Sequence, residues 1–198
     1  MKPIDRGEVL GLADYETIRD HFRSRVIGAK KRRRVQLGPR ATAVFENRDT
    51  ILLQIQEMLR TERITRPAAI LHEIDTYNEN LPGDDQLSCT VMIEIADDDE
   101  REAFLKAAVG FENHLWLVLG GTDRIKAHGA DRGLPEFDRT TAVHYLKFNL
   151  PKASADSLRA STGTTALIEL ESDHPAYPVR VKLAPETVLE ICDDLRGL

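Results

Sequence analysis

Four acidic and histidine side chains of this chain could act together in metal binding or proton transfer. They are Glu46, Glu62, His144 and His174. Carboxylates and imidazoles bind iron, zinc and manganese, and the same groups serve as general acids and bases. Two histidines and one carboxylate would suit a mononuclear site, whereas the paired E-x-x-H motifs of di-iron bundles are absent from the sequence. We therefore expect these four residues to form a candidate ligand site that could hold a single metal ion. The residue types do not decide whether the site is catalytic.

Each histidine also has a structural interpretation. His144 lies in a strand-like stretch in which alternation places it on the same face as Leu146 and Phe148, so that face is expected to be buried. A half-buried histidine commonly bonds a backbone or carboxylate group instead of a ligand. Asp173 could orient His174 as carboxylates orient metal-binding histidines, and the alternative is a local turn.

A run of positive charge forms a second candidate site, for an anion or a partner. It comprises Lys30, Lys31, Arg32, Arg33 and Arg34, with Arg48 nearby. Arginine forks bind phosphate, and clustered cations supply the electrostatic part of nucleic-acid binding. The alternative is a solvated helix end, where cations complement the helix dipole. The pI of about 5.6 opposes a dedicated nucleic-acid binder.

Several classes of protein are excluded or disfavoured. No G-x-G-x-x-G, Walker or G-x-S-x-G pattern occurs, so we expect no nucleotide cofactor and no hydrolase nucleophile of that type. The two cysteines, Cys89 and Cys192, are too few for a disulfide scaffold or for a chain that binds its own iron–sulfur cluster. No apolar run could span a membrane and no signal peptide is evident, so we expect a cytoplasmic location without membrane contact.

The N-terminal part of the chain is predicted to be mainly helical, and these helices would position its candidate site residues. Apolar periodicity predicts helices over 14–31, 48–63 and from 67 to about 80, with Asn47 as an N-cap and Pro67 at a first position. Residues 35–37 and 41–45 predict a hairpin around Gly38-Pro39. In the second of these helices Glu57 points away from the apolar face, so it should be solvated. Glu62 falls on that face, so it must end the helix, be paired or belong to a site.

Strand patterns dominate after residue 87. A strand–helix–strand–strand order occurs twice, with strands near 89–95, 115–119, 125–128, 142–150, 166–170 and 179–183 and helices over 97–108, 151–160 and 185–195. The fold class is therefore α+β: N-terminal helices and a short hairpin packed on a mixed or antiparallel sheet built from two such units. We expect a single domain over 1–198, with a soft boundary near 81–86. Residues 1–66 hold 15 Lys and Arg against 9 Asp and Glu, and the remainder holds 12 against 24, so the two parts should attract each other.

Seven stretches together resemble a bacterial family of unknown function, domain of unknown function 3501. They are residues 32–35, 45–50, 54–64, 73–78, 90–95, 139–146 and 173–177, and they span nearly the whole chain. The resemblance implies a redox or oxidative-stress setting, with a rubrerythrin-like or iron–sulfur protein as a partner. It implies no specific chemistry. The arginines and carboxylates in these stretches could equally form a buried ion-pair network that fixes the N-terminal helices on the sheet.

Three functions follow as hypotheses. The first is an accessory or small-ligand or metal-binding protein in a redox pathway. The second is an enzyme, with or without a metal ion, that uses Glu46, Glu62, His144 or His174. The third is a nucleic-acid binder that uses the basic run.

Overall fold

The computed structural model describes residues 1–129, 138–161 and 166–198 of the chain. Its helices are α1 (Leu12–Arg32), α2 (Arg48–Thr61), α3 (Pro67–Asn78), α4 (Asp98–Ala107), α5 (Lys152–Ala160) and α6 (Pro185–Arg196). Short 3-10 turns occur at η1 (Arg6–Glu8) and η2 (Phe111–His114). Its strands are β1 (Arg34–Leu37), β2 (Ala41–Phe45), β3 (Gln86–Ile93), β4 (Leu115–Leu119), β5 (Asp123–Gly129), β6 (Val143–Asn149), β7 (Ile168–His174) and β8 (Tyr177–Lys182). The α+β class expected from the sequence is confirmed.

The helix ends follow local sequence signals. Asn47 caps α2 and forms a reciprocal pair of hydrogen bonds with Thr50, which satisfies donors that the first turn leaves free. Pro67 begins α3, where its missing N–H costs nothing. Among the helices of the described chain, none is both long enough and apolar enough to cross a lipid bilayer.

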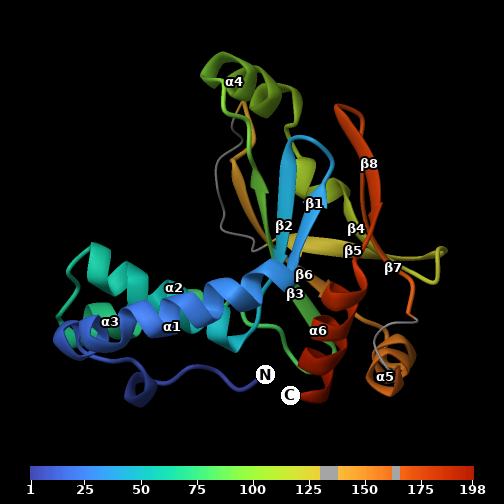
Figure 1. Cartoon of the computed structure of the whole chain (residues 1–198). Coiled ribbons are helices and arrows are strands. Elements are labelled where there is room, and N and C mark those ends of the chain that lie inside the picture. The colour runs from blue at the N-terminus through green and yellow to red at the C-terminus, as the bar shows by residue number, and fades with distance from the viewer. Residues whose placement is uncertain (130–137, 162–165) are drawn as a thin grey trace.

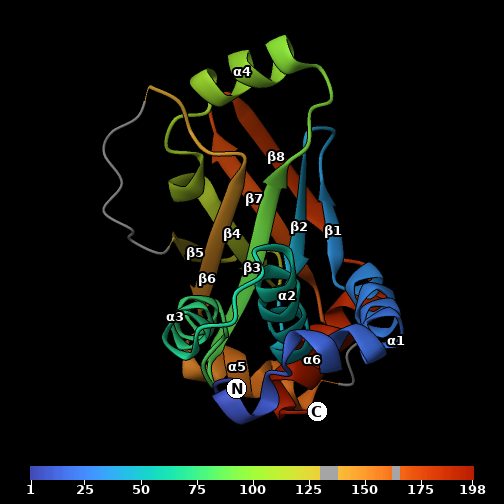
Figure 2. The same cartoon turned by 90° about the vertical axis from the view of Figure 1, so that its left-hand side faces the viewer.

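All strands belong to one curled, eight-stranded sheet in the order β1-β2-β3-β6-β5-β4-β7-β8 (Figures 1 and 2). Every pairing is antiparallel. The β1–β2 hairpin is therefore part of the sheet, through β2–β3 pairing, and is not packed on top of it as expected. Strand β6 lies between β3 and β5, so the two strand–helix–strand–strand segments are interleaved in space.

Tyr177 joins the two edges of this nearly closed barrel. Its hydroxyl, at the start of β8, donates to the carbonyl of Leu37 at 2.6 Å and accepts from the backbone N–H of Arg40 at 2.9 Å. Gly38 makes this approach possible, because it has a left-handed φ of +69° and a Cβ there would lie 2.7 Å from the Tyr177 hydroxyl. Side-chain bonds thus link β8 to the β1–β2 turn.

Two apolar clusters hold the fold together. The larger fills the barrel with inward residues of its strands and of α4, α5 and α6, including Phe45, Leu117 and Phe148. The smaller joins the N-terminal segment, α2 and α3, through residues such as Ile4 and Ile55. Helix α4 lies across one end of the barrel and α5 and α6 lie at the other, while α1, α2 and α3 form a group on one outer side (Figures 1 and 2).

Candidate functional site

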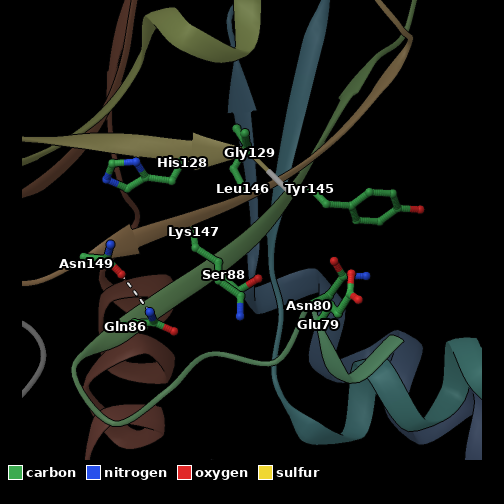
Figure 3. Close-up of a pocket in the computed structure, with 10 residues that line it drawn as sticks. All are labelled: Glu79, Asn80, Gln86, Ser88, His128, Gly129, Tyr145, Leu146, Lys147 and Asn149. Atoms are coloured by element: carbon green, nitrogen blue, oxygen red, sulfur yellow. Dashed lines mark hydrogen bonds between the residues drawn. The ribbon is translucent and has the colours of Figure 1, made fainter. Parts of the chain in front are cut away.

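A polar pocket lies on the outer face of β3, β6 and β5. Side-chain alternation creates this face: Leu87 and Cys89 of β3 point into the barrel core, so Ser88 points outward, and Lys147 of β6 points outward between the buried Leu146 and Phe148. The volume is about 340 Å³. The lining residues are Glu79, Asn80, Gln86, Ser88, His128, Gly129, Tyr145, Leu146, Lys147 and Asn149 (Figure 3). We call this the β3–β6 pocket.

Strand register brings the polar groups of the pocket together. Ser88 lies directly opposite Lys147 in the β3–β6 pairing, and His128 of β5 lies opposite Lys147 on its other side. Gln86 and Asn149, the next outward pair, are joined by a side-chain hydrogen bond of 2.7 Å. Glu79 and Asn80 approach from the end of α3 (Figure 3). Helix and sheet therefore both contribute hydrogen-bonding groups.

Lys147 is the electrostatic centre of the β3–β6 pocket. Its side chain is half-buried, and burial lowers the pKa of the ammonium group, an effect that the Glu79 carboxylate partly offsets. In the described part of the chain, no carboxylate lies within ion-pair distance of Lys147 and no hydrogen bond to its side chain is found. An anionic or hydrogen-bond-accepting ligand would satisfy this group.

Glu46 lies beside the same sheet face, directly after β2. It is 3% exposed, and its Oε1 accepts hydrogen bonds from Thr90 of β3 at 2.6 Å and from Gln54 of α2 at 3.2 Å. Its Oε2 is buried and has no hydrogen-bond partner among the described residues. Thr90 and Ser88 share the outward face of β3, so Glu46 adjoins the β3–β6 pocket without lining it.

The two predicted histidines lie elsewhere, inside one end of the barrel. The rings of His144 and His174 flank Phe111, at centroid distances of 5.5 Å and 6.3 Å. Burial lowers the pKa of His144, which faces inward as alternation predicted, and the Glu112 carboxylate 3.7 Å from Nδ1 partly offsets this. These two members of the predicted set are close to a common aromatic ring, while Glu46 is on the outside of the sheet.

His174 has a structural set of partners. Its Nδ1 accepts from the backbone N–H of Ala176 at 3.1 Å, and its Nε2 lies 3.1 Å from the carbonyl oxygen of Val109, so the ring is held as the Nε2–H tautomer. Asp173 does not orient it. That carboxylate bonds His114 and Arg124 on the outer face, since adjacent strand residues point to opposite sides. The expected loop is a tight turn between β7 and β8.

Glu62 ends α2 as its C-cap and is exposed. Of the three alternatives given by its position, the helix end is therefore the one observed. Within residues 1–129, 138–161 and 166–198, no three His, Cys, Asp or Glu side chains come together as a group that could hold a metal ion. The four predicted residues thus form no common ligand set in that part of the chain.

The basic run is largely occupied by carboxylates. Arg33 is buried and forms two hydrogen bonds with Asp194 of α6, at 2.5 Å and 2.8 Å, and Arg32 pairs with Glu190 at 2.5 Å. Arg34 pairs with Glu94, at 2.7 Å. Arg48 pairs with Glu8 in the N-terminal segment. Among the described residues, Lys30 and Lys31 are the members of the run without an ion pair. Of the pairs named here, the Arg33–Asp194 pair is buried, whereas those of Arg32, Arg34 and Arg48 are partly exposed, so the buried network suggested as an alternative is seen at Arg33 and not along the whole run.

Comparisons with known proteins agree with the resemblance. The family model described as "Protein of unknown function (DUF3501)" matches residues 3–195. The chain belongs to the DUF3501 family. A crystal structure titled as a novel protein of unknown function from Burkholderia pseudomallei K96243 superposes on it with a TM-score of 0.89. That protein is 32% identical, and the match covers 98% of this chain and 99% of the other. No curated protein matches the sequence.

Sequence reasoning missed the central residues of the β3–β6 pocket in this DUF3501 protein. One signal was present: Lys147 lies in an otherwise apolar strand, and alternation places its side chain on the face opposite to that of His144. This alternation by itself predicts an ordinary lysine exposed to solvent. The decisive fact is the pairing of Lys147 with Ser88, which lies 59 positions earlier in the chain. Such long-range register leaves no local trace in the sequence.

Proposed function

We propose that this DUF3501 protein is a small-ligand-binding protein that takes a small, polar, anionic metabolite into the β3–β6 pocket. The observation that carries the proposal is Lys147, which is half-buried in the pocket and has no carboxylate within ion-pair distance in the described part of the chain. Partial burial makes the charged form of an unpaired ammonium group less favourable, and a bound anion would offset that cost.

The pocket also suits a ligand of limited size. Its volume of about 340 Å³ corresponds to roughly ten water molecules and lies at the lower end of ordinary ligand pockets. Ser88 and Asn80, both nearly fully buried, line it with a hydroxyl and an amide that could fix the orientation of a carboxylate or phosphate. The carboxylate of Glu79 at the rim would disfavour ligands with several negative charges.

Isothermal titration of the full-length protein with lactate, succinate and inorganic phosphate tests this function. We expect saturable binding of at least one probe, and a loss of at least about tenfold in affinity in Lys147→Met, equivalent to about 1.4 kcal/mol. Lys182→Met is the matched control, because Lys182 is also on a strand but exposed. The proposal fails if no probe binds, or if Lys147→Met binds as tightly as the wild type.

The redox setting and the rubrerythrin-like or iron–sulfur partner remain a prediction of the family resemblance. We propose such a partner without a surface assigned to it. Affinity purification from native extract under reducing and oxidising conditions is the test. Failure to recover either kind of protein under both conditions would count against the partner and leave the ligand-binding proposal intact.

A further inference from the structure

Lys147 differs chemically from the other lysines of the described chain. Lys106 and Lys152 pair with carboxylates on their own helices, and Lys126 lies over the ring of Trp116. Lys182 is exposed. Lys147 alone combines a place in a pocket with burial that lowers the pKa of its ammonium group. At a given pH, Lys147 is therefore the neutral amine in a larger fraction of molecules than an exposed lysine would be, and the neutral amine is the nucleophilic form.

The surroundings of Lys147 suit attack on a carbonyl group. Ser88 is its direct cross-strand neighbour, and such pairs bring Cβ atoms to roughly 5 Å of each other. Figure 3 shows the side chains of Lys147 and Ser88 next to each other at the centre of the pocket, with Asn80 and Glu79 on one side and His128 on the other. The hydroxyl and the amide can donate to a carbonyl oxygen, and Glu79 and His128 are acids or bases at the rim.

We propose that Lys147 forms an imine with a small aldehyde or ketone that enters the β3–β6 pocket. This inference rests on the proposed function and narrows its ligand class to carbonyl compounds that also carry an anionic group. The neutral Nζ attacks the carbonyl carbon, the C=O π electrons move to oxygen, and a proton passes from nitrogen to that oxygen. Loss of this hydroxyl with a second proton as water leaves the C=N bond. No oxidant or reductant is needed.

The probes for this test are glyoxylate and pyruvate, each added to the full-length protein with sodium cyanoborohydride, which reduces an imine to a stable secondary amine. Peptide mass spectrometry then locates the adduct. We expect modification of Lys147 to be several-fold faster than that of Lys182 in the same sample. In Lys147→Arg the adduct should disappear from this peptide, whereas Lys182→Arg should keep it. The wild-type comparison does not depend on whether a variant folds.

Two results would overturn the imine. Modification spread evenly over exposed lysines would show that the pocket confers no selectivity. Saturable binding of lactate or succinate without any adduct on Lys147 would refute the imine while the proposed ligand-binding function stands. Absence of both binding and adduct would remove both proposals.

Discussion

Replacement of Arg33 by methionine should destabilise the protein strongly. The Arg33 side chain is 4% exposed and the Asp194 side chain 5%, and the two share hydrogen bonds of 2.5 Å and 2.8 Å. Glu190 lies 2.9 Å from the same guanidinium. Removal of one partner of such a buried pair leaves an uncompensated charge and costs about 3–5 kcal/mol. At a urea m-value of about 2–3 kcal/mol/M, the unfolding midpoint should fall by about 1–2.5 M.

Arg34→Met is the matched control for this experiment. Arg34 follows Arg33 directly and pairs with Glu94, but both side chains are nearly half exposed, so the loss should stay within about 1 kcal/mol. The double variant Arg33→Met with Asp194→Leu should recover much of the lost stability, because it removes both charges. If Arg33→Met and Arg34→Met lower the midpoint equally, the buried network does not fix α6 against the start of β1, and our reasoning about the basic run is wrong.

Three further outcomes follow from the contacts described above. Gly38→Ala should lower the free energy of unfolding by about 1–2 kcal/mol in thermal or urea unfolding, because Gly38 has a left-handed φ and lies against the Tyr177 hydroxyl. The same substitution should cost less in a Tyr177→Phe background, and equal costs in the two backgrounds would contradict the steric argument. Arg19, together with the Tyr15 hydroxyl, lowers the pKa of Glu57 to about 2. The ionised Glu57 should therefore contribute about 1 kcal/mol to the free energy of unfolding above pH 4.5, and this contribution should be lost as the pH falls towards 2. Glu57→Gln should flatten this part of the plot of stability against pH. Burial raises the pKa of the Cys89 thiol, so a thiol reagent should modify it no faster than the protein unfolds; rapid modification in native buffer would show local opening of β3.

Local features of the fold were predictable because they depend on neighbouring residues. The Asn47 cap, the Pro67 start of α3 and the inward face of His144 all follow from patterns a few residues long. The α+β class follows from the order of such patterns. The interleaving of β6 between β3 and β5 does not, since it depends on pairing between distant strands.

The candidate site was harder to predict for the same reason. Glu57 was expected to be solvated, but α1 covers it and Arg19 binds it at 2.8 Å. Glu46 was identified from its type. The structure shows it buried beside a pocket instead of next to His144, with one oxygen that has no partner among the described residues. Lys147 was not identified, because its surroundings come from three strands and the end of α3. Residue type suggested chemistry, whereas tertiary pairing decides which groups can meet.

The interleaved strand order has a consequence for how the chain folds during synthesis. The β4–β5 hairpin can form as soon as it leaves the ribosome, but it reaches β3 only through β6, which is made later. Until then β3 presents an unpaired edge that could capture another chain. The ion pair of Arg33 forms later still, since Asp194 lies 161 residues further along the chain. The nascent protein should therefore depend on protection of its early strands until the last helix is complete.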